Sequence, residues 1–428
     1  MTSGGPAAEG GALAHLRVLD LSRVLAGPWA TQVLADLGAE VIKVERPGRG
    51  DDTRGWGPPW LRDRSGAETS ESAYFLAANR GKKSVAVDLS HPEGQEIVRR
   101  LAAGSDVLVE NFKVGDLDRY GLGHRELSEA NPALISCSIT GFGQDGPYRR
   151  RAGYDFLIQG MGGLMSVTGE PGGAPGGGPM KAGVAIVDVL TGMYAATAIL
   201  AALAHRQRSG RGQRVDLALL DVQVAMLANL AQGYLVTGVP PGRLGNAHPS
   251  IVPYQAFATS DGHITLAVGN DGQFSRFCDV AGRPELADDP RFATNAARVE
   301  HRRELLPVLE GILAGRGSAE WIAALEAAAV PCGPINGLAE VFQDPQVRHR
   351  GMRIEAPHPL SGTVPLVASP IRLSATPVSE PSAPPTLGQH TAEVLAGVLG
   401  MGPAEIEGLR ARGVIGAGRP ASGPGPMR

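Results

Sequence analysis

One carboxylate stands alone in an apolar stretch of the chain. Between Lys181 and His205, in "KAGVAIVDVLTGMYAATAILAALAH", the only side chain charged at neutral pH is Asp188. Burying an ionised carboxylate without a partner is costly, so this placement needs an explanation. Asp188 could cap a helix that starts near Thr191, where aspartate is a favoured residue type. It could also be an anionic nucleophile held ready at a helix start. The residue pattern leaves both explanations open.

Basic residues recur just after predicted strands, in the segments "KVERPG", "NRGKKS" and "GDLDRYGLG". The group consists of Arg46, Arg80, Lys82, Lys83 and Arg119. Ligands of open α/β sheets bind beyond the carboxyl ends of the strands, so cations gathered there would suit a nucleotide with several phosphates. The alternative is ordinary solvated surface charge.

Two other kinds of site are disfavoured. "GFGQDG" at 141–146 has the spacing G-x-G-x-x-G, but Pro147 and three arginines follow in place of the helix that a dinucleotide site requires. The cysteines Cys137, Cys278 and Cys332 are odd in number and widely separated, and no His or Cys pair has metal-ligand spacing. We therefore expect no disulfide framework, no metal and a reducing, cytoplasmic location.

Composition limits the possible partners. The chain has 428 residues, 19% of them charged, and a formal net charge of −3, so no dominant basic surface is available for nucleic acid. The N-terminus lacks the basic and apolar regions of a signal peptide. The longest uncharged run, 189–204, is shorter than the roughly 20 residues of a membrane span. These features predict a protein that binds neither nucleic acid nor membrane.

The surrounding elements predict an α/β fold. Residues 16–45 indicate a strand, a helix that begins near Pro28, a glycine turn and a second strand. The pattern continues with "KSVAVDLS", a helix from Pro92 to Gly104, "DVLVEN" and "ALISCSIT". Strands that alternate with helices favour a parallel sheet with right-handed crossovers, so a Rossmann-like large domain is expected.

The predicted pattern of secondary structure changes in the second half of the chain. "YQAFATSDGHITLAVGN" predicts a hairpin with "SDG" as its turn, followed by short helices. We predict a large domain over 14–224, a smaller α+β domain over 225–335, a return to the large domain over 336–412 and a disordered tail over 413–428.

A series of motifs in order resembles the class III CoA-transferases, the family of formyl-CoA transferase and carnitine CoA-transferase. It runs from "VLDLSRVLAGPWATQVLADLGAEVIKVERPGRGDDTR" through "NRGKKSVAVDL", "DVLVENF", "SITGFGQDGPY", "AGYD", "VDVLTGMYA" and "SGRGQRVDLALLD" to "VPCGPIN" and "LGQHT". The segments "ERPGRGDDTRGWGPP" and "GNAHPSIVPYQAF" look most like those of the succinyl-CoA–glutarate (dicarboxylate) CoA-transferases.

The resemblance implies a fold, a partner and a set of site residues. It implies an interlocked homodimer, coenzyme A as co-substrate and Asp188 as the nucleophile that carries an aspartyl mixed anhydride and an aspartyl-CoA thioester. It places the CoA contacts on Val24, Leu25, Arg46, Val87, Asp88, Leu89, Ser90, Asn111, Phe112, Arg119, Thr140, Gly141 and Gly143.

Departures from relatives define the alternatives. α-Methylacyl-CoA racemase, of the same superfamily, has a histidine in a "GHD" motif as partner base; this chain has Tyr154 in "AGYD", which disfavours racemisation. Formyl-CoA transferase has a glycine-run loop where this chain has "GNAHPSIVPY", so formate and oxalate chemistry is not carried over. In this loop we predict oxyanion and substrate contacts from Gly245, Asn246, His248 and Ser250, with His248 either reading a distal carboxylate or an ordinary loop residue. A CoA-ester binder without transfer activity is the remaining alternative.

Overall fold

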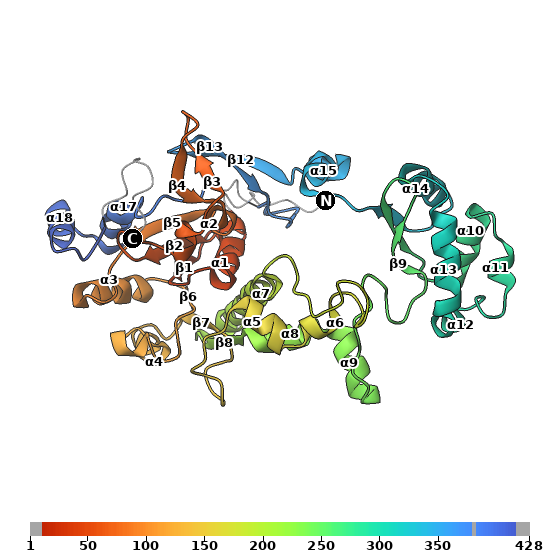
Figure 1. Cartoon of the computed structure of the whole chain (residues 1–428). Helices are drawn as coiled ribbons and strands as arrows, with labels where there is room; N and C mark the ends of the chain where they lie inside the picture. The colour runs from red at the N-terminus through yellow and green to blue at the C-terminus, as the bar shows by residue number, and fades with distance from the viewer. Residues whose placement is uncertain (1–10, 379–381, 417–428) are drawn as a thin grey trace, which may run out of the picture. The chain divides into compact units, whose positions relative to one another are not determined.

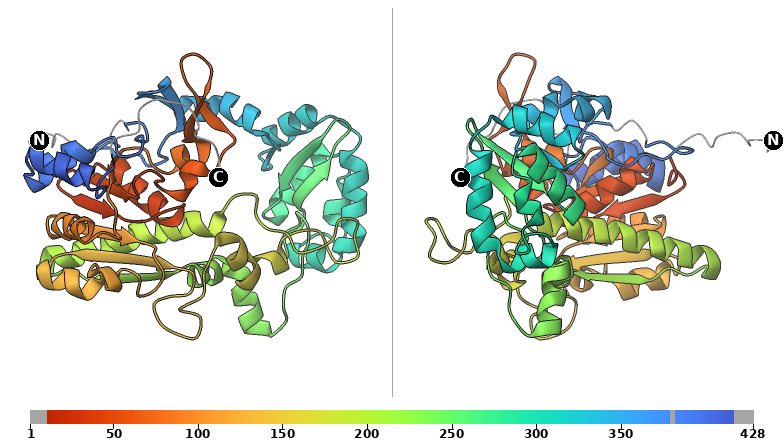
Figure 2. Two further views of the ribbon diagram at one scale, coloured as in Figure 1. Left: turned by 60° about the vertical axis from the view of Figure 1, so that its left-hand side comes forward. Right: turned by 90° about the vertical axis from the view of Figure 1, so that its right-hand side faces the viewer.

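The computed structural model describes residues 11–378 and 382–416, which form two compact units. Of the described residues, unit 1 comprises 11–162, 182–231, 348–378 and 382–416, and unit 2 comprises 163–181 and 232–347. Figures 1 and 2 show the elements of both units. The predicted boundaries at 225 and 335 differ from this division, chiefly because 163–181 joins unit 2 while 232–347 extends beyond the predicted end. Each unit is described by itself.

Unit 1 is built on a six-stranded, wholly parallel sheet with the strand order β5-β2-β1-β6-β7-β8. The strands are β1 (Arg17–Asp20), β2 (Glu40–Glu45), β5 (Lys82–Ala86), β6 (Val107–Glu110), β7 (Ile135–Thr140) and β8 (Arg214–Ala218). The parallel α/β fold predicted from the alternating strands and helices is confirmed. The chain winds outward in one direction through β2 and β5 and in the other through β6, β7 and β8. The crevice between β1 and β6 is therefore the switch point at which such sheets bind ligands.

Apolar residues on both faces of the sheet form two cores, because neighbouring strand residues point to opposite faces. Leu19 and Ile42 pack with one set of helices, whereas Val18 and Val41 pack with the other. The first set comprises α3 (Pro92–Ala103), α4 (His124–Ala130), α17 (Thr391–Leu399) and α18 (Pro403–Ala411). The second comprises α1 (Ala26–Asp36), α5 (Asp155–Met161), α7 (Ile186–Ser209) and α8 (Leu219–Met226).

The long helix α7 explains the apolar stretch around Asp188. It runs beside α1 (Figure 2), and a Cβ placed on Gly192 would lie 2.7 Å from the carbonyl oxygen of Ala26, so the two helices approach closely. By length and composition alone α7 could cross a membrane, as could the bent pair of α8 and α9 (Ala228–Thr237) taken together. In α7 the buried residues Ala195, Ile199 and Ala202 belong to the core, which accounts for the apolar composition.

Smaller elements complete unit 1. They are η1 (Asp52–Gly55), β3 (Trp60–Arg62), β4 (Glu68–Ser72), α2 (Ala73–Ala77), η2 (Asp118–Tyr120), β12 (Arg353–His358) and β13 (Gly362–Val367). The predicted disordered tail over 413–428 is wrong at its start. Val414 and Ile415 are buried, and Ile415 forms a β-bridge with Val87, because the sheet edge offers both apolar contacts and free backbone groups. Residues 417–428 lie outside the described part of the chain.

Unit 2 contains an antiparallel sheet in the order β11-β10-β9 with short helices around it. The strands are β9 (Tyr254–Ala258), β10 (His263–Ala267) and β11 (Cys332–Pro334), and the helices are α6 (Leu164–Val167), α10 (Asp271–Val280), α11 (Glu285–Asp288), α12 (Asn295–Glu300), α13 (Arg302–Leu313), α14 (Ser318–Ala327) and α15 (Leu338–Gln343). Helix α16 (Pro345–His349) crosses the boundary with unit 1. The predicted hairpin is confirmed as β9–β10, with Thr259 N–H donating to Gly262 across the "SDG" turn.

Candidate active site

Asp188 is the third residue of α7, and it does not cap that helix. The helix begins at Ile186, earlier than the predicted start near Thr191, and its N-cap Ala185 makes no side-chain capping bond. The capping group comes from α5, where the Asp155 carboxylate accepts from the N–H of Val187 at 2.8 Å and of Asp188 at 3.3 Å. Asp155 satisfies two of the free amides at the helix start, so the side chain of Asp188 is not needed for capping. The capping explanation for Asp188 is therefore wrong.

The half-buried carboxylate of Asp188 makes no hydrogen bond or ion pair within the described residues. Burial, together with the smaller effect of the negative charge of Asp155, raises the pKa of Asp188 to about 7. A desolvated carboxylate without a cationic partner is more reactive than one that is paired or fully hydrated. Sequence reasoning missed Asp155, although an aspartate at the first position of the short helix in "AGYD" was a signal for it.

Asp188 opens into a hollow of about 230 Å³ at the carboxyl ends of β1, β6 and β7. Residues predicted to contact CoA share its lining, namely Val24, Leu25, Asn111, Phe112, Thr140 and Gly141. Gly143 does not line it; its N–H donates to the Thr140 hydroxyl and so shapes the turn after β7. The structure thus brings the nucleophile candidate together with six of the predicted residues at the switch point of the sheet.

A second hollow of about 390 Å³ adjoins the first, because Arg23, Asp52, Phe112 and Asp116 line both. It holds the remaining predicted contacts Arg46, Val87, Asp88, Leu89 and Ser90. Arg119 lines neither hollow but forms an ion pair with Asp116. Two adjoining hollows, the first of which is lined by Asp188, offer room for an extended ligand that has one reacting end.

Three of the five basic residues grouped by sequence are engaged elsewhere, so that part of the interpretation is wrong. Arg80 pairs with buried Asp36, Lys82 with buried Asp20, and Lys83 with Glu40 and Glu393. The reason is their position in the chain: Arg80 precedes β5, and Lys82 and Lys83 are its first two residues, so none of them follows the carboxyl end of a strand, where ligands bind.

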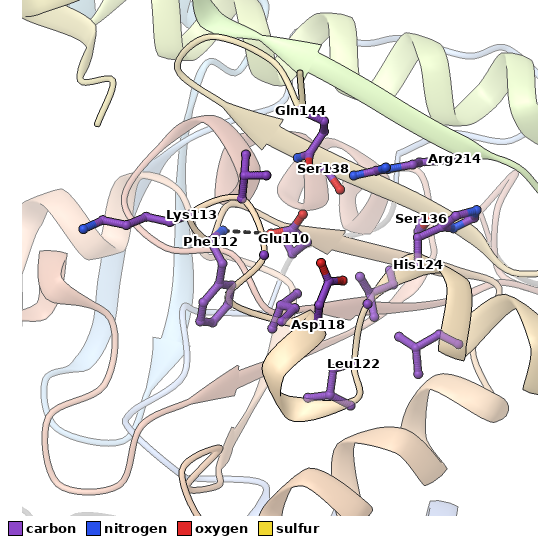
Figure 3. Close-up of a pocket in the computed structure, with 16 residues that line it drawn as sticks. Glu110, Phe112, Lys113, Asp118, Leu122, His124, Ser136, Ser138, Gln144 and Arg214 are labelled. Atoms are coloured by element: carbon purple, nitrogen blue, oxygen red, sulfur yellow. Dashed lines mark hydrogen bonds between the residues drawn. The ribbon is translucent and has the colours of Figure 1, made fainter. Parts of the chain in front are cut away.

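A third hollow beside β6 and β7 is too small for an acyl group (Figure 3). Its volume is about 40 Å³, and Glu110, Asp118, His124 and Arg214 are among its lining residues. The Glu110 carboxylate accepts from the N–H of Phe112 at 2.8 Å, and burial raises the pKa of Glu110. Glu110 therefore holds the turn that carries Asn111 and Phe112 toward the larger hollows.

The turn after β1, which lines the Asp188 hollow, has a strained backbone at Val24. Val24 has a φ of 70°, and it is the one β-branched residue with a positive φ among the non-glycine residues described. Such a conformation costs about 1–3 kcal/mol and persists only where the surroundings enforce it. Asn111 fixes Arg23, the residue before Val24: its side-chain oxygen accepts from the N–H of Arg23 and its side-chain amide donates to the Arg23 carbonyl.

The predicted substrate loop belongs to unit 2. Gly245 has a φ of 60° and donates to the Gly169 carbonyl, while Asn246 and Ser250 are exposed. The Nδ1 atom of His248 accepts from the N–H of Ser250 at 3.0 Å, and its ring lies 5.3 Å from that of Tyr254. This leaves Nε2 of His248 as the nitrogen that can donate to a ligand. The roles of the loop residues stay predictions. Within the described part of the chain, no cluster of His, Cys, Asp or Glu suits a metal ion.

Two glycines set the distance between β7 and the segment that carries Tyr154 and Asp155. A Cβ on Gly141 would lie 2.5 Å from the Cα of Gly153, a separation that real Cβ atoms do not reach. Gly141→Ala is expected to push this segment away, lowering kcat by about tenfold or more and lowering the Tm. Gly397→Ala, at an open helical position, is the matched control and should leave kcat unchanged while the Tm stays or rises. Steady-state kinetics and thermal melts of both variants test this, and full activity of Gly141→Ala would contradict it.

Comparison with known proteins agrees with this geometry. The model of "CoA-transferase family III" matches residues 13–391. The chain is 52% identical to succinate–glutarate CoA-transferase of Agrobacterium fabrum over 90% of this chain and 95% of that protein. It is 46% identical to succinyl-CoA:glutarate CoA-transferase of Mus musculus over 94% of this chain and 90% of that protein. A CAIB/BAIF family protein from Brucella suis, solved by crystallography, matches with a TM-score of 0.80 and 49% identity, covering 91% of this chain and all of that one. The chain therefore belongs to CoA-transferase family III and is a CoA-transferase that uses coenzyme A as co-substrate.

Proposed function

We propose that this enzyme moves CoA from succinyl-CoA to a dicarboxylic acid such as glutarate, with Asp188 as the covalent carrier. The observation that carries the proposal is the unpaired, desolvated carboxylate of Asp188 in the lining of the first of two adjoining hollows. Relatives at 52% and 46% identity are named for this donor and this acceptor, which supports the proposal.

The chemistry conserves the energy of the thioester in covalent form. The Asp188 carboxylate attacks the thioester carbonyl of the donor, the carbon–sulfur bond breaks, and a mixed anhydride and CoA thiolate result. The thiolate attacks the Asp188 carbonyl, which releases the donor acid and leaves an Asp188–CoA thioester. The acceptor carboxylate then attacks this thioester, and returning thiolate attacks the acceptor's carbonyl in the second anhydride, which frees Asp188. Each step exchanges one acyl bond for another, so neither ATP nor water is needed.

Each tetrahedral intermediate needs hydrogen-bond donors directed at its oxyanion. From the sequence alone, we propose that backbone N–H groups of the loop from Gly245 to Ser250 supply these donors and that Nε2 of His248 binds the distal carboxylate of the acid. The prediction for His248→Ala is that turnover of succinyl-CoA falls about tenfold more than turnover of butyryl-CoA, because only succinate has a second carboxylate. Steady-state kinetics with the two donors measure this. Equal losses would leave His248 as an ordinary loop residue.

Three arginines in the lining of the Asp188 hollow support a dicarboxylate substrate. Arg149, Arg150 and Arg151 all line the Asp188 hollow, and none forms an ion pair within the described residues. The guanidinium of Arg151 lies 4.6 Å from the ring centre of Tyr148, which holds it in place by a cation–π contact. A second carboxylate on the acyl group could form ion pairs with these arginines, whereas a plain fatty acyl chain has no charge to pair with them.

A panel of donors and acceptors tests the proposed substrate class. With succinyl-CoA as donor, we expect CoA esters of glutarate and related dicarboxylates to form, followed by mass, and those of butyrate or valerate to form at least about a hundredfold more slowly. Faster transfer to monocarboxylates would contradict the dicarboxylate assignment.

Two alternatives give different outcomes in trapping experiments. A CoA-ester binder or racemase would form no activated ester, so hydroxylamine added after succinyl-CoA would leave residue 188 unmodified. The transferase should yield an aspartyl hydroxamate at Asp188. Tyr154 lines the hollow where the racemase would require an imidazole, which favours the transferase.

We further propose a cytoplasmic homodimer. All three cysteines are free, as expected for a reducing compartment. Large apolar side chains are exposed on and after α9, including Leu235 and Val236 at more than 70% of their surface. Such surface in a monomer would be unfavourable in water, so a partner chain would cover it. Light scattering after size exclusion measures the state, and a monomeric mass would contradict the dimer.

A further inference from the structure

Two buried charged side chains, Asp51 and Lys43, form hydrogen bonds with the backbone of the turn between β1 and α1. Asp51 lies at the base of this turn, and its carboxylate oxygens accept from the N–H of Val24 at 3.2 and 3.3 Å. The Lys43 ammonium donates to the carbonyl of Ser22 at 2.8 Å. Together with the Asn111 amide at Arg23, these groups fix three consecutive residues of the turn.

Asp51 is itself fixed and almost completely buried. It forms an ion pair of 2.9 Å with Lys43, and both side chains are fully inaccessible to solvent. It also accepts from the backbone N–H and the hydroxyl of Thr53 at 3.0 and 2.8 Å. Burial alone would raise the pKa of Asp51, but Lys43 and the Thr53 hydrogen bonds lower it overall, so the group stays ionised.

The strained residue Val24 is also the residue whose N–H donates to the Asp51 carboxylate. Left-handed backbone is disfavoured for valine because its branched side chain crowds the backbone, and nothing on the valine side chain compensates for it. The N–H of Val24 points at Asp51 in this conformation. A charged acceptor that is buried and immobile makes a stronger hydrogen bond than water does, so it can select the strained conformation.

We propose that Asp51 is a positioning residue for CoA transfer: it holds Val24 in the left-handed conformation and thereby fixes the wall that Val24 and Leu25 contribute to the Asp188 hollow. The inference rests on the proposed acyl-transfer role of that hollow. Asp51 acts through Val24 and need not touch the substrate. A displaced wall would misplace the thioester carbonyl relative to Asp188, and errors of about 1 Å at a reacting centre cost about 10²-fold in rate.

A double-mutant cycle tests the inference. Asp51→Asn keeps the shape of the side chain but removes the charge, and we expect kcat to fall about a hundredfold. Val24→Gly alone should lower kcat about threefold, because glycine adopts positive φ without strain but also leaves it freely. In the double variant, glycine no longer needs the carboxylate, so kcat should recover about tenfold relative to Asp51→Asn. Additive losses would overturn the proposal, because they would mean that Asp51 does not act through Val24.

Controls separate positioning from folding. Asp36→Asn breaks another buried ion pair of unit 1, that with Arg80, and should lower the Tm while kcat per folded enzyme is unchanged. If Asp51→Asn does not fold, Thr53→Val weakens the same carboxylate more gently by removing one hydrogen bond. It should lower kcat about fivefold, and Val24→Gly should again offset the loss. Absence of any such offset would overturn the proposal.

Hydroxylamine trapping in the wild-type enzyme distinguishes this inference from the proposed function. If Asp188 were trapped but the losses in the cycle were additive, only the positioning role of Asp51 would be refuted and the proposed carrier would stand. Absence of trapping at Asp188 would refute the proposed carrier, whatever the cycle showed.

Discussion

Asp188→Asn is expected to abolish CoA transfer, with kcat falling by at least about 10⁴-fold. The amide has nearly the same size and keeps the position on α7, but it cannot form an anhydride or accept the thiolate to give a thioester. The two connected hollows remain intact, so the variant should bind CoA and succinyl-CoA with dissociation constants close to those of the wild type. Product formation followed by mass and binding followed by calorimetry measure the two quantities separately.

A matched control tests whether an Asp→Asn change at the third position of a helix is harmful in itself. Asp221 occupies the third position of α8, as Asp188 does in α7, but its side chain is exposed. Asp221→Asn makes the same chemical change at the same helical position and should retain full activity. Retention of a tenth or more of the wild-type kcat in Asp188→Asn would exclude Asp188 as the obligatory carrier.

The second large effect concerns Asp155 and pH. Because the pKa of Asp188 lies near 7, and only the ionised form attacks, kcat/KM for the donor should fall about tenfold per pH unit below that value. Asp155→Asn removes the nearby negative charge that raises the pKa of Asp188. The acid limb of the profile should therefore move to lower pH. At pH 8, where Asp188 is ionised in either enzyme, kcat should fall about a hundredfold, because a neutral amide holds the start of α7 less firmly.

The direction of the shift decides the assignment. If Asp155 only supported the fold, Asp155→Asn would lower the rate equally at every pH and leave the limb in place. A limb that moved to higher pH would contradict the electrostatic argument itself. Asp221→Asn again serves as control, because this exposed carboxylate should leave both the limb and the rate unchanged.

The chain order of strands and helices could be predicted because it depends on local patterns. Short aliphatic runs, Pro28 and Pro92 near helix starts, and glycines at helix ends are readable one segment at a time, and the structure confirms the parallel sheet. The boundaries were less accurate where long-range contacts decide. Val414 and Ile415 are ordered because they meet the edge of a sheet whose nearest strand ends more than three hundred residues earlier.

The sequence by itself determined the family and singled out Asp188, since an uncompensated carboxylate in an apolar run is visible without coordinates. Only the tertiary structure decided what surrounds that carboxylate. Asp155 caps α7 from another helix, Lys82 and Arg80 are buried partners of Asp20 and Asp36, and Asp51 reaches Val24 from the segment after β2. Each of these contacts joins residues that are distant in the chain. Their free energies depend on burial and on the distance between the charged atoms, which no local sequence pattern specifies.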